Sequence, residues 1–382
     1  MKILKRVLAT LAILVGLTVI LAYIFDVTYL FKAVRTIYLK GHKTAYLEDY
    51  KVFDNDTVRA GQNTLHWPIH PDYNQVPPTE KLLKTHESAG TIAYLIIKND
   101  SIWHEAYYDG FDQNSKSNSF SMAKSFVSGL LGKAIMDGYI ESLDQPLGDF
   151  FPKYKNDKTT VGDLASMASG LDWDEAYYSP FSITTKAYFY HDLNKMMLKL
   201  DIIEEPGVTY EYLSGSTQLL AMVIEKATGK RLANYFQDAF WQPLGAENDA
   251  LWQLDSDQHK TVKAYCCFAS NARDFARFGK LYKDHGQWQG EQLLDAAFVA
   301  KSIRPRFEGA PYGYGFWLGD YKGKNFFVMR GHLGQYVITI PEDNLMIVRL
   351  GHLKGPNDGS NDFPDNFWVY IEEGYEMLQQ FK

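Results

Sequence analysis

Short runs of β-branched and aromatic residues lie towards both ends of this chain, and segments with helical spacing fill its middle. Such runs, bounded by turn residues, are typical of strands, whereas apolar residues three and four apart are typical of helices. The predicted strands cover residues 91–97, 101–108, 314–318, 325–329, 335–340 and 345–350. The predicted helices include residues 121–137, 216–228 and 366–380.

This order of elements favours an α+β fold over a wound parallel sheet. The expected architecture is an antiparallel sheet built from both chain ends and flanked by helices, with a mostly helical inserted subdomain. Of the 382 residues, 46% are hydrophobic and 22% charged, which is the composition of a folded protein with a large core. The net charge of −7 comes without a block of Lys and Arg, so nucleic acid is not an expected partner.

Cys266 and Cys267 are the two cysteines of the chain, and they are adjacent. Ordinary disulfide geometry requires a larger separation of Cα atoms than neighbouring residues allow. A zinc site would need a second pair of ligands, which the sequence lacks. The sequence therefore predicts two packed thiols in a strand, with neither a disulfide nor a metal holding the fold.

The N-terminus combines three basic residues (Lys2, Lys5 and Arg6) with an uncharged run over residues 7–25. At ~1.5 Å per residue, a helix of that length spans ~28 Å, close to the thickness of a bilayer core. A cleaved signal peptide is an alternative, but the run ends without a small-x-small cleavage site, and a buried helix is a second alternative. The prediction is an uncleaved membrane anchor.

Orientation follows from the very short N-terminal tail, which favours a cytoplasmic N-terminus, although basic residues after the span oppose the usual charge bias. The catalytic domain is thus expected outside the cytoplasm, at the periplasmic or extracellular face of a bacterial inner membrane. The predicted organisation is an anchor at 1–25, a membrane-proximal stalk and lead-in at 26–75, and one domain at 76–382.

Several common catalytic motifs are absent, including G-x-S-x-G, H-E-x-x-H, the P-loop and G-x-G-x-x-G. The chain has one S-x-x-K sequence, Ser121-Met122-Ala123-Lys124, at the start of a predicted helix. Residues three apart share a helix face, so the Lys124 ammonium can reach the Ser121 hydroxyl, which is a poor nucleophile without such a neighbour. The alternative is a serine that caps a helix beside an exposed lysine.

Further segments in a fixed order strengthen the first interpretation. Residues 119–126 (SFSMAKSF) resemble the nucleophile segment of the penicillin-recognising serine enzymes, in particular the class C β-lactamase-like branch with its esterases and 6-aminohexanoate-dimer hydrolases. The other family-like segments are 160–164 (TVGDL), 167–173 (MASGLDW), 206–207 (PG), 210–214 (YEYLS), 272–279 (ARDFARFG), 312–317 (YGYGFW) and 331–334 (GHLG). The resemblance covers roughly residues 80 to 375.

The resemblance implies a β-lactamase/transpeptidase-like fold and a division of roles. Ser121 would attack a carbonyl, while Lys124 and Tyr212 share proton transfer, and which of the two is the formal base stays open. Ser214 would position protons near Lys124. The backbone N–H groups of Ser121 and Gln335 would form the oxyanion hole.

Two more sites follow from the resemblance. His332 stands in the third motif, where K-T-G or H-x-G belongs, and Leu333 lacks the threonine hydroxyl that would help to hold a substrate carboxylate. Tyr177 and Tyr178 lie in a stretch that bears a substrate-closing tyrosine in 6-aminohexanoate-dimer hydrolases.

The expected function is hydrolysis of a small-molecule ester or linear amide through a covalent acyl-enzyme on Ser121, without a metal or an organic cofactor. A β-lactamase or D-alanyl-D-alanine carboxypeptidase is one alternative. A non-catalytic, membrane-tethered ligand-binding or sensor protein is another. The joint presence of Ser121, Lys124 and Tyr212 speaks against the last, because a binding protein has no need of all three.

Overall fold

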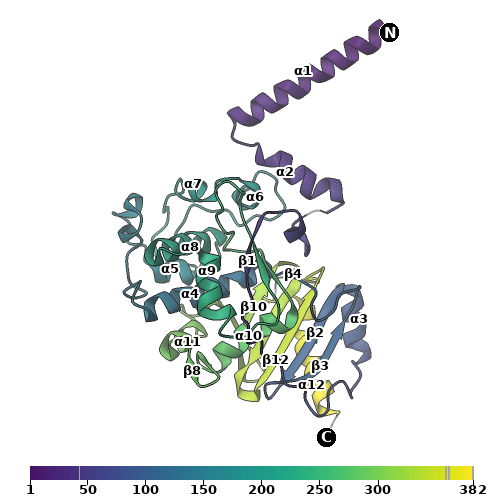
Figure 1. Ribbon diagram of the computed structural model, residues 1–382, viewed down its shortest axis with the longest axis vertical. Coiled ribbons are helices and arrows are strands. Elements are labelled where there is room, and N and C mark those ends of the chain that lie inside the picture. The colour runs from purple at the N-terminus through teal and green to yellow at the C-terminus, as the bar shows by residue number, and fades with distance from the viewer. Residues whose placement is uncertain (43, 358, 360–361, 381–382) are drawn as a thin grey trace.

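The main sheet of the computed structural model has six antiparallel strands in the order β3-β2-β12-β11-β10-β9 (Figure 1). The structure describes residues 1–42, 44–357, 359 and 362–380. The strands are β2 (Thr91–Lys98), β3 (Ser101–Tyr107), β9 (Trp317–Tyr321), β10 (Lys324–Gly331), β11 (Gln335–Ile340) and β12 (Leu345–Gly351). Since β12 pairs with β2, the sheet joins the two ends of the chain, and the predicted α+β architecture is confirmed.

The sheet is buried on both faces because helices cover each of them. Helix α10 (Ala272–Lys283) packs on β11 and β12, and α12 (Asp365–Gln379) packs on β12 and on α3 (Glu80–Ser88). Alternate residues of a strand point to opposite faces. Accordingly, Leu95 lies in one core and Ile96 in the other.

A helical part stands on one side of this sheet (Figure 1). Its elements are α4 (Ala123–Met136), α5 (Val161–Ala165), α6 (Ile183–Phe189), α7 (Leu193–Met197), α8 (Ser214–Thr228), α9 (Leu232–Phe236) and α11 (Ala296–Ser302). Helices α4 and α8 pack on each other, and most of their residues are buried. The predicted helix start at Ser121 is slightly early, because the 3₁₀ turn η3 (Phe120–Met122) precedes α4.

A second sheet, which the sequence did not predict, has the order β1-β5-β6-β4. Its strands are β1 (Asn55–Val58), β5 (Ala250–Gln253), β6 (Phe268–Ser270) and β4 (Ser117–Asn118). Through β1, and through the buried side chains of Leu47 and Phe53, the stretch 26–75 contributes to the larger hydrophobic core. The predicted boundary near residue 76 stays a prediction.

The two cysteines form a disulfide, Cys266–Cys267, so the prediction of two thiols packed in a strand is wrong. Both residues precede β6, and Cys267 has a φ of +73°. Neighbouring side chains point to opposite faces only in extended backbone. The left-handed conformation at Cys267 breaks that alternation, which the argument from ordinary strand geometry did not allow for.

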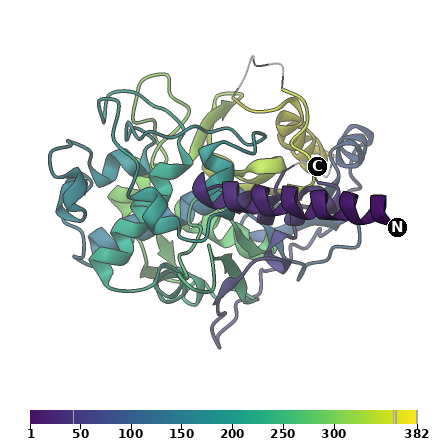
Figure 2. The ribbon, with the colours of Figure 1, turned by 90° about the horizontal axis from the view of Figure 1, so that it is seen from above.

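The N-terminal helix α1 (Lys2–Ile24) projects away from the rest of the molecule (Figure 1), and seen from above it runs across the top of the domain (Figure 2). Its residues are exposed apart from Ala22, and the helix is long and apolar enough to cross a membrane by length and composition. The short helix α2 (Tyr29–Thr36) follows and lies against α6. Residues after the apolar helix are therefore fixed on the domain.

Candidate active site

Ser121 and Lys124 are in direct contact at the junction of η3 and α4. Lys124 Nζ donates to Ser121 Oγ at 2.9 Å and to the carbonyl oxygen of Tyr265 at 2.8 Å. The spacing of three residues on a helix predicts this contact. Lys124 is 2% exposed, whereas Ser121 lines a cavity of about 270 Å³. The structure thus presents the hydroxyl to a pocket and hides the amine behind it.

Burial changes the acidity of the amine. It lowers the pKa of Lys124 from its ordinary value of 10.5 to about 8, and the negative charge of Glu175 opposes this shift. Desolvation disfavours the charged ammonium because the surroundings solvate it poorly. About one-tenth of the amine is therefore uncharged at pH 7, far more than in a solvent-exposed lysine.

The residue before Ser121 adopts an unusual backbone conformation. Phe120 has a φ of +46°, in the region that favours glycine, and its N–H donates to the Asn118 side chain at 2.9 Å. The preceding N–H, that of Ser119, donates to the Phe268 carbonyl of β6 at 2.7 Å. Such conformations persist where surrounding contacts enforce them. Here they fix the turn that directs Ser121 into the pocket.

Tyr212 lies just before α8 and lines the same pocket as Ser121. Its ring is 5.2 Å from Trp317, and Lys124 Nζ is 5.0 Å from its centre. Burial and Glu175 raise the pKa of the Tyr212 hydroxyl, although its hydrogen bond with Ser121 lowers it. The hydroxyl is thus protonated at neutral pH.

Glu175 is a pocket residue that the sequence analysis missed. Its carboxylate accepts from the backbone N–H and the hydroxyl of Ser214, both at 2.6 Å, and from the Trp173 indole at 2.8 Å. It also accepts from the Tyr177 hydroxyl. Ser214 is therefore directed to Glu175, and the structure shows no bond from it to Lys124. A lone acid in a loop carries no motif by which to find it.

His332 lies where the third motif was predicted, in the turn between β10 and β11. Its ring stacks on Tyr177, with centroids 5.4 Å apart, and contacts Phe120 edge-on. Burial and the charge of Lys354 lower the pKa of His332 to about 4, so the imidazole is neutral at pH 7. The neighbouring Leu333 has a φ of +62°.

Gln335 begins β11, beside the site. Its buried side chain donates to the carbonyl oxygens of His332, at 3.1 Å, and Gly351, at 2.7 Å. The side chain therefore holds the turn of the third motif in place. The oxyanion role of its backbone N–H stays a prediction.

Two cations complete the pocket lining, Arg330 and Lys354. The Arg330 guanidinium lies 4.5 Å from the ring centre of Trp317 and donates to the Asp362 carbonyl at 2.7 Å. Neither cation is within ion-pair distance of a carboxylate among the residues that the structure describes. Arg330 directly precedes the third motif, so its position in the sequence was a usable signal.

Tyr177 and Tyr178 also line the pocket and belong to the loop before α6, and the substrate-closing role of either tyrosine stays a prediction. Tyr178 is 65% exposed, and its ring lies 6.3 Å from that of His332. Within the described part of the chain, no group of three or more His, Cys, Asp or Glu side chains is placed to hold a metal ion.

Comparison with known proteins shows the family of the chain. The Beta-lactamase family model matches residues 79–365, about three quarters of the chain, and the chain therefore belongs to that family. The resemblance and the fold drawn from the sequence are both confirmed.

Two curated relatives match over part of their length. A 6-aminohexanoate-dimer hydrolase of Paenarthrobacter ureafaciens is 26% identical over 244 residues, which cover 59% of either protein. A D-aminopeptidase of Brucella anthropi is 25% identical over 237 residues, 56% of this chain and 44% of the relative. The chain thus spans about six-tenths or less of the length of the curated relatives that it matches.

Solved structures share the fold more completely. A Bacillus anthracis protein described as a proposed 6-aminohexanoate-dimer hydrolase superposes with a TM-score of 0.73 at 19% identity, covering 87% of this chain and 91% of that one. A D-amino acid amidase from Ochrobactrum anthropi gives a TM-score of 0.60 at 17% identity, over 78% and 97% of the two chains. At these identities the likeness concerns the fold alone.

Proposed function

We propose that this protein is a serine hydrolase that cleaves an ester or a linear amide through a covalent acyl-enzyme on Ser121. The observation that carries the proposal is the contact of 2.9 Å between Ser121 Oγ and a buried amine with a pKa of about 8. A serine hydroxyl becomes an effective nucleophile when a neighbouring base accepts its proton. Lys124 is such a base in its uncharged form, whose fraction rises as the pH increases through about 8.

The proposed reaction has two halves. The neutral Lys124 amine accepts the Ser121 proton as Oγ attacks the carbonyl carbon, and the backbone N–H groups of Ser121 and Gln335 stabilise the oxyanion. The ammonium returns a proton to the leaving alcohol or amine, and the acyl group stays on Ser121. Water then attacks the acyl carbon and gives its proton to the amine, and the acid leaves as Ser121 regains its hydrogen.

Tyr212 acts in this scheme as a neutral hydroxyl that passes the proton between Lys124 and the leaving group. Its raised pKa argues against a phenolate acting as the base. Glu175 acts as a positioning residue, because it holds Ser214 and Tyr177 at the edge of the pocket.

Substrate class follows from the third motif and from the names of the relatives. A 6-aminohexanoate-dimer hydrolase and a D-aminopeptidase both act on linear amides by name, which supports an ester or amide substrate here. A penicillin carries a carboxylate, and at the third motif of this chain it meets a neutral His332, while Leu333 stands in place of the threonine hydroxyl. Arg330, which contacts Trp317 and the Asp362 carbonyl, and Lys354 also line the pocket but stand outside the third motif, so the comparison of the two substrates tests whether either cation replaces the missing lysine.

We expect kcat/KM for p-nitrophenyl acetate to exceed that for nitrocefin by roughly 10- to 150-fold at pH 7, the loss that one missing charge-assisted hydrogen bond causes. Side-by-side kinetics of the full chain with both substrates test this. Faster turnover of nitrocefin would favour the β-lactamase alternative instead. Turnover of neither, by a folded protein, would favour the non-catalytic binding protein.

We further propose that α1 is an uncleaved anchor and that the domain lies outside the cytoplasm. The support is a single exposed apolar helix of 23 residues without a cleavage signal at its end. N-terminal sequencing of the membrane fraction is expected to find the original start, and a start beyond Ala22 contradicts the anchor. Protease added to spheroplasts is expected to digest the domain, and complete protection contradicts the orientation.

A further inference from the structure

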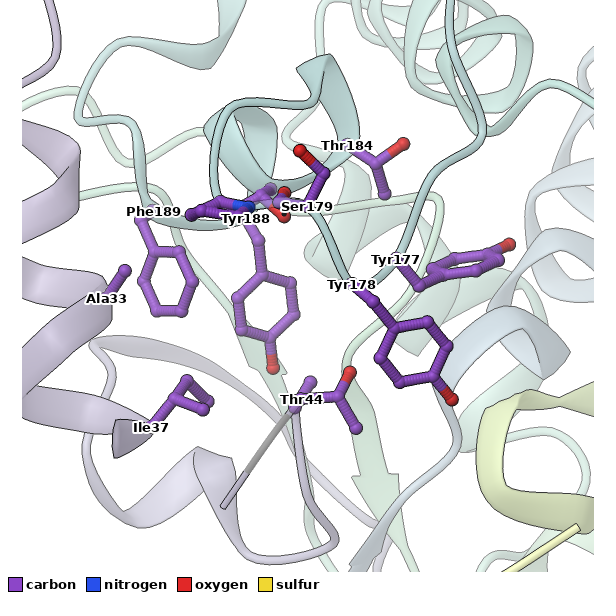
Figure 3. Close-up of a pocket in the computed structure, with 12 residues that line it drawn as sticks. Ala33, Ile37, Thr44, Tyr177, Tyr178, Ser179, Thr184, Tyr188 and Phe189 are labelled. Carbon is purple, nitrogen blue, oxygen red and sulfur yellow. Dashed lines mark hydrogen bonds between the residues drawn. The ribbon is translucent and has the colours of Figure 1, made fainter. Parts of the chain in front are cut away.

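A second cavity, of about 70 Å³, adjoins the pocket of Ser121 (Figure 3). Ala33 of α2 and Ile37, which directly follows α2, form one side of it, and Tyr177 and Tyr178 form the opposite side. These two tyrosines also line the pocket of Ser121. The two spaces are therefore separated only by the loop that carries them and by the contacts of that loop.

The lining of this second cavity is mainly apolar. Ala33, Ile37 and Phe189 are buried hydrophobic residues of its wall. The ring of Tyr188 faces it, while the Tyr188 hydroxyl donates to the buried Asp49 carboxylate at 2.5 Å. Water gains few hydrogen bonds in such a space, whereas hydrocarbon is favoured there.

Position relative to the apolar helix adds a second argument. Helix α2, which contributes Ala33 to the cavity wall, begins at Tyr29, five residues after α1 ends. It is held on the domain by the bond from the Tyr29 hydroxyl to the Pro180 carbonyl at 3.0 Å, and by the Asp26–Lys186 ion pair at 2.8 Å. If α1 spans the membrane as proposed, this cavity lies where the chain leaves the bilayer.

The wall between the two spaces includes a side chain that can turn. Tyr178 is 65% exposed and forms no hydrogen bond through its hydroxyl within the described part of the chain. Thr44, which lines the second cavity, is 3.5 Å from the His332 ring of the catalytic pocket. A chain of methylene groups that leaves the pocket of Ser121 beside Tyr178 would thus enter the second cavity.

We propose that this cavity binds a hydrocarbon chain of the substrate, so that the enzyme acts on amphiphilic esters or amides whose chain extends from the scissile bond towards α2. The inference rests on the proposed hydrolase function and specifies its substrate class. The hydrocarbon chain of the substrate is part of either the acyl group or the leaving group, and the experiment distinguishes these two cases.

The experiment measures kcat/KM for the full chain in lipid nanodiscs with two substrate series. One series is p-nitrophenyl esters from acetate to decanoate, and the other is n-alkyl acetates over the same range of lengths, followed by acid release. One series is expected to rise about fourfold per methylene, the effect of burying that group, and to level off after roughly four, since the cavity holds about that many water-sized groups.

Ala33→Leu is the test variant, because its added carbons fill the cavity from α2. It is expected to flatten the rise while leaving acetate turnover within about twofold of the wild type. Val34→Leu is the matched control, since Val34 is the next residue of the same helix and is 45% exposed. Val34→Leu is expected to keep the rise of kcat/KM with chain length. Because longer esters partition into the lipid equally for both variants, this control also corrects for partition.

Ala45→Leu fills the same cavity from the lead-in and serves if Ala33→Leu fails to fold. Two results would overturn this inference and leave the hydrolase function intact. In the first, the wild type hydrolyses the acetate ester but its kcat/KM does not rise with chain length in either series; in the second, kcat/KM rises equally in the wild type and in both filled variants. Absence of acetate turnover in the wild type would instead count against the hydrolase function itself.

Discussion

Replacement of Ser121 by alanine is expected to lower kcat/KM for p-nitrophenyl acetate by roughly 10⁴-fold or more, with little change in the melting temperature. Loss of the nucleophile removes the acyl-enzyme route, and in a well-studied serine protease this costs on the order of 10⁶-fold in kcat. The serine is half-buried and donates no bond on which packing depends, so the fold is expected to persist.

The matched control is Ser125→Ala, one helical turn further along α4. The Ser125 hydroxyl donates to the Gly315 carbonyl at 2.5 Å and does not line the pocket, so its loss is expected to affect stability more than turnover. A fluorophosphonate is expected to label the wild type and Ser125→Ala on one serine, and to leave Ser121→Ala unlabelled. Turnover by Ser121→Ala near the wild-type rate, in a folded protein, would refute Ser121 as the nucleophile.

The long strands of the main sheet were predictable because each carries a pattern long enough to identify. β11 was predicted at its observed ends, and β2, β10 and β12 within one or two residues. Buried strands of six to eight residues have continuous β-branched and aromatic runs, which few other structures require. Their pairing of both chain ends then follows from the antiparallel fold class.

The second sheet was not predictable in the same way. Its strands β1, β4 and β6 have two to four residues, too few for a pattern with a period of two. The vicinal disulfide depends on the backbone conformation of Cys267, with its φ of +73°, and no composition or spacing signals that conformation. In both cases tertiary contacts determine the local structure.

The candidate site likewise contains contacts that the sequence predicts and contacts that it does not. Ser121 and Lys124 are three residues apart, so local helix geometry predicts their contact, and the structure shows it at 2.9 Å. Glu175 reaches Ser214 from 39 residues away through folding of an irregular loop. Arg330 enters the pocket because β10 ends there. The contact of Glu175 comes from the fold and leaves no spacing in the sequence, whereas Arg330 directly precedes the third motif and could have been found by that position.

The pH dependence of turnover distinguishes the two candidate bases. With a pKa of about 8, Lys124 is protonated and unable to accept the Ser121 proton at lower pH, and it is free above that value. Activity of the wild type is therefore expected to rise through pH 8 and then level off. The phenol of Tyr212, whose pKa is raised, would place the rise at a much higher pH.

Variants separate the two groups further. Lys124→Met keeps a buried aliphatic side chain without the amine. It is expected to lower kcat/KM by about 10³-fold, which is the scale of the loss of a general base, and to remove the rise in activity near pH 8. Tyr212→Phe is expected to cost about 10²-fold and to keep the rise, since the amine remains.

The lysine control is Lys133→Met, on the same helix. The Lys133 ammonium pairs with Asp137 at a distance of 2.6 Å, and neither residue lines the pocket. Rates are measured from pH 6 to 10 with p-nitrophenyl acetate, and spontaneous hydrolysis is subtracted using Ser121→Ala. If Tyr212→Phe abolishes the rise while Lys124→Met retains it, the roles are reversed and the tyrosine is the base. A rise retained in both variants would mean that neither group accepts the Ser121 proton, because the titrating group would then lie elsewhere.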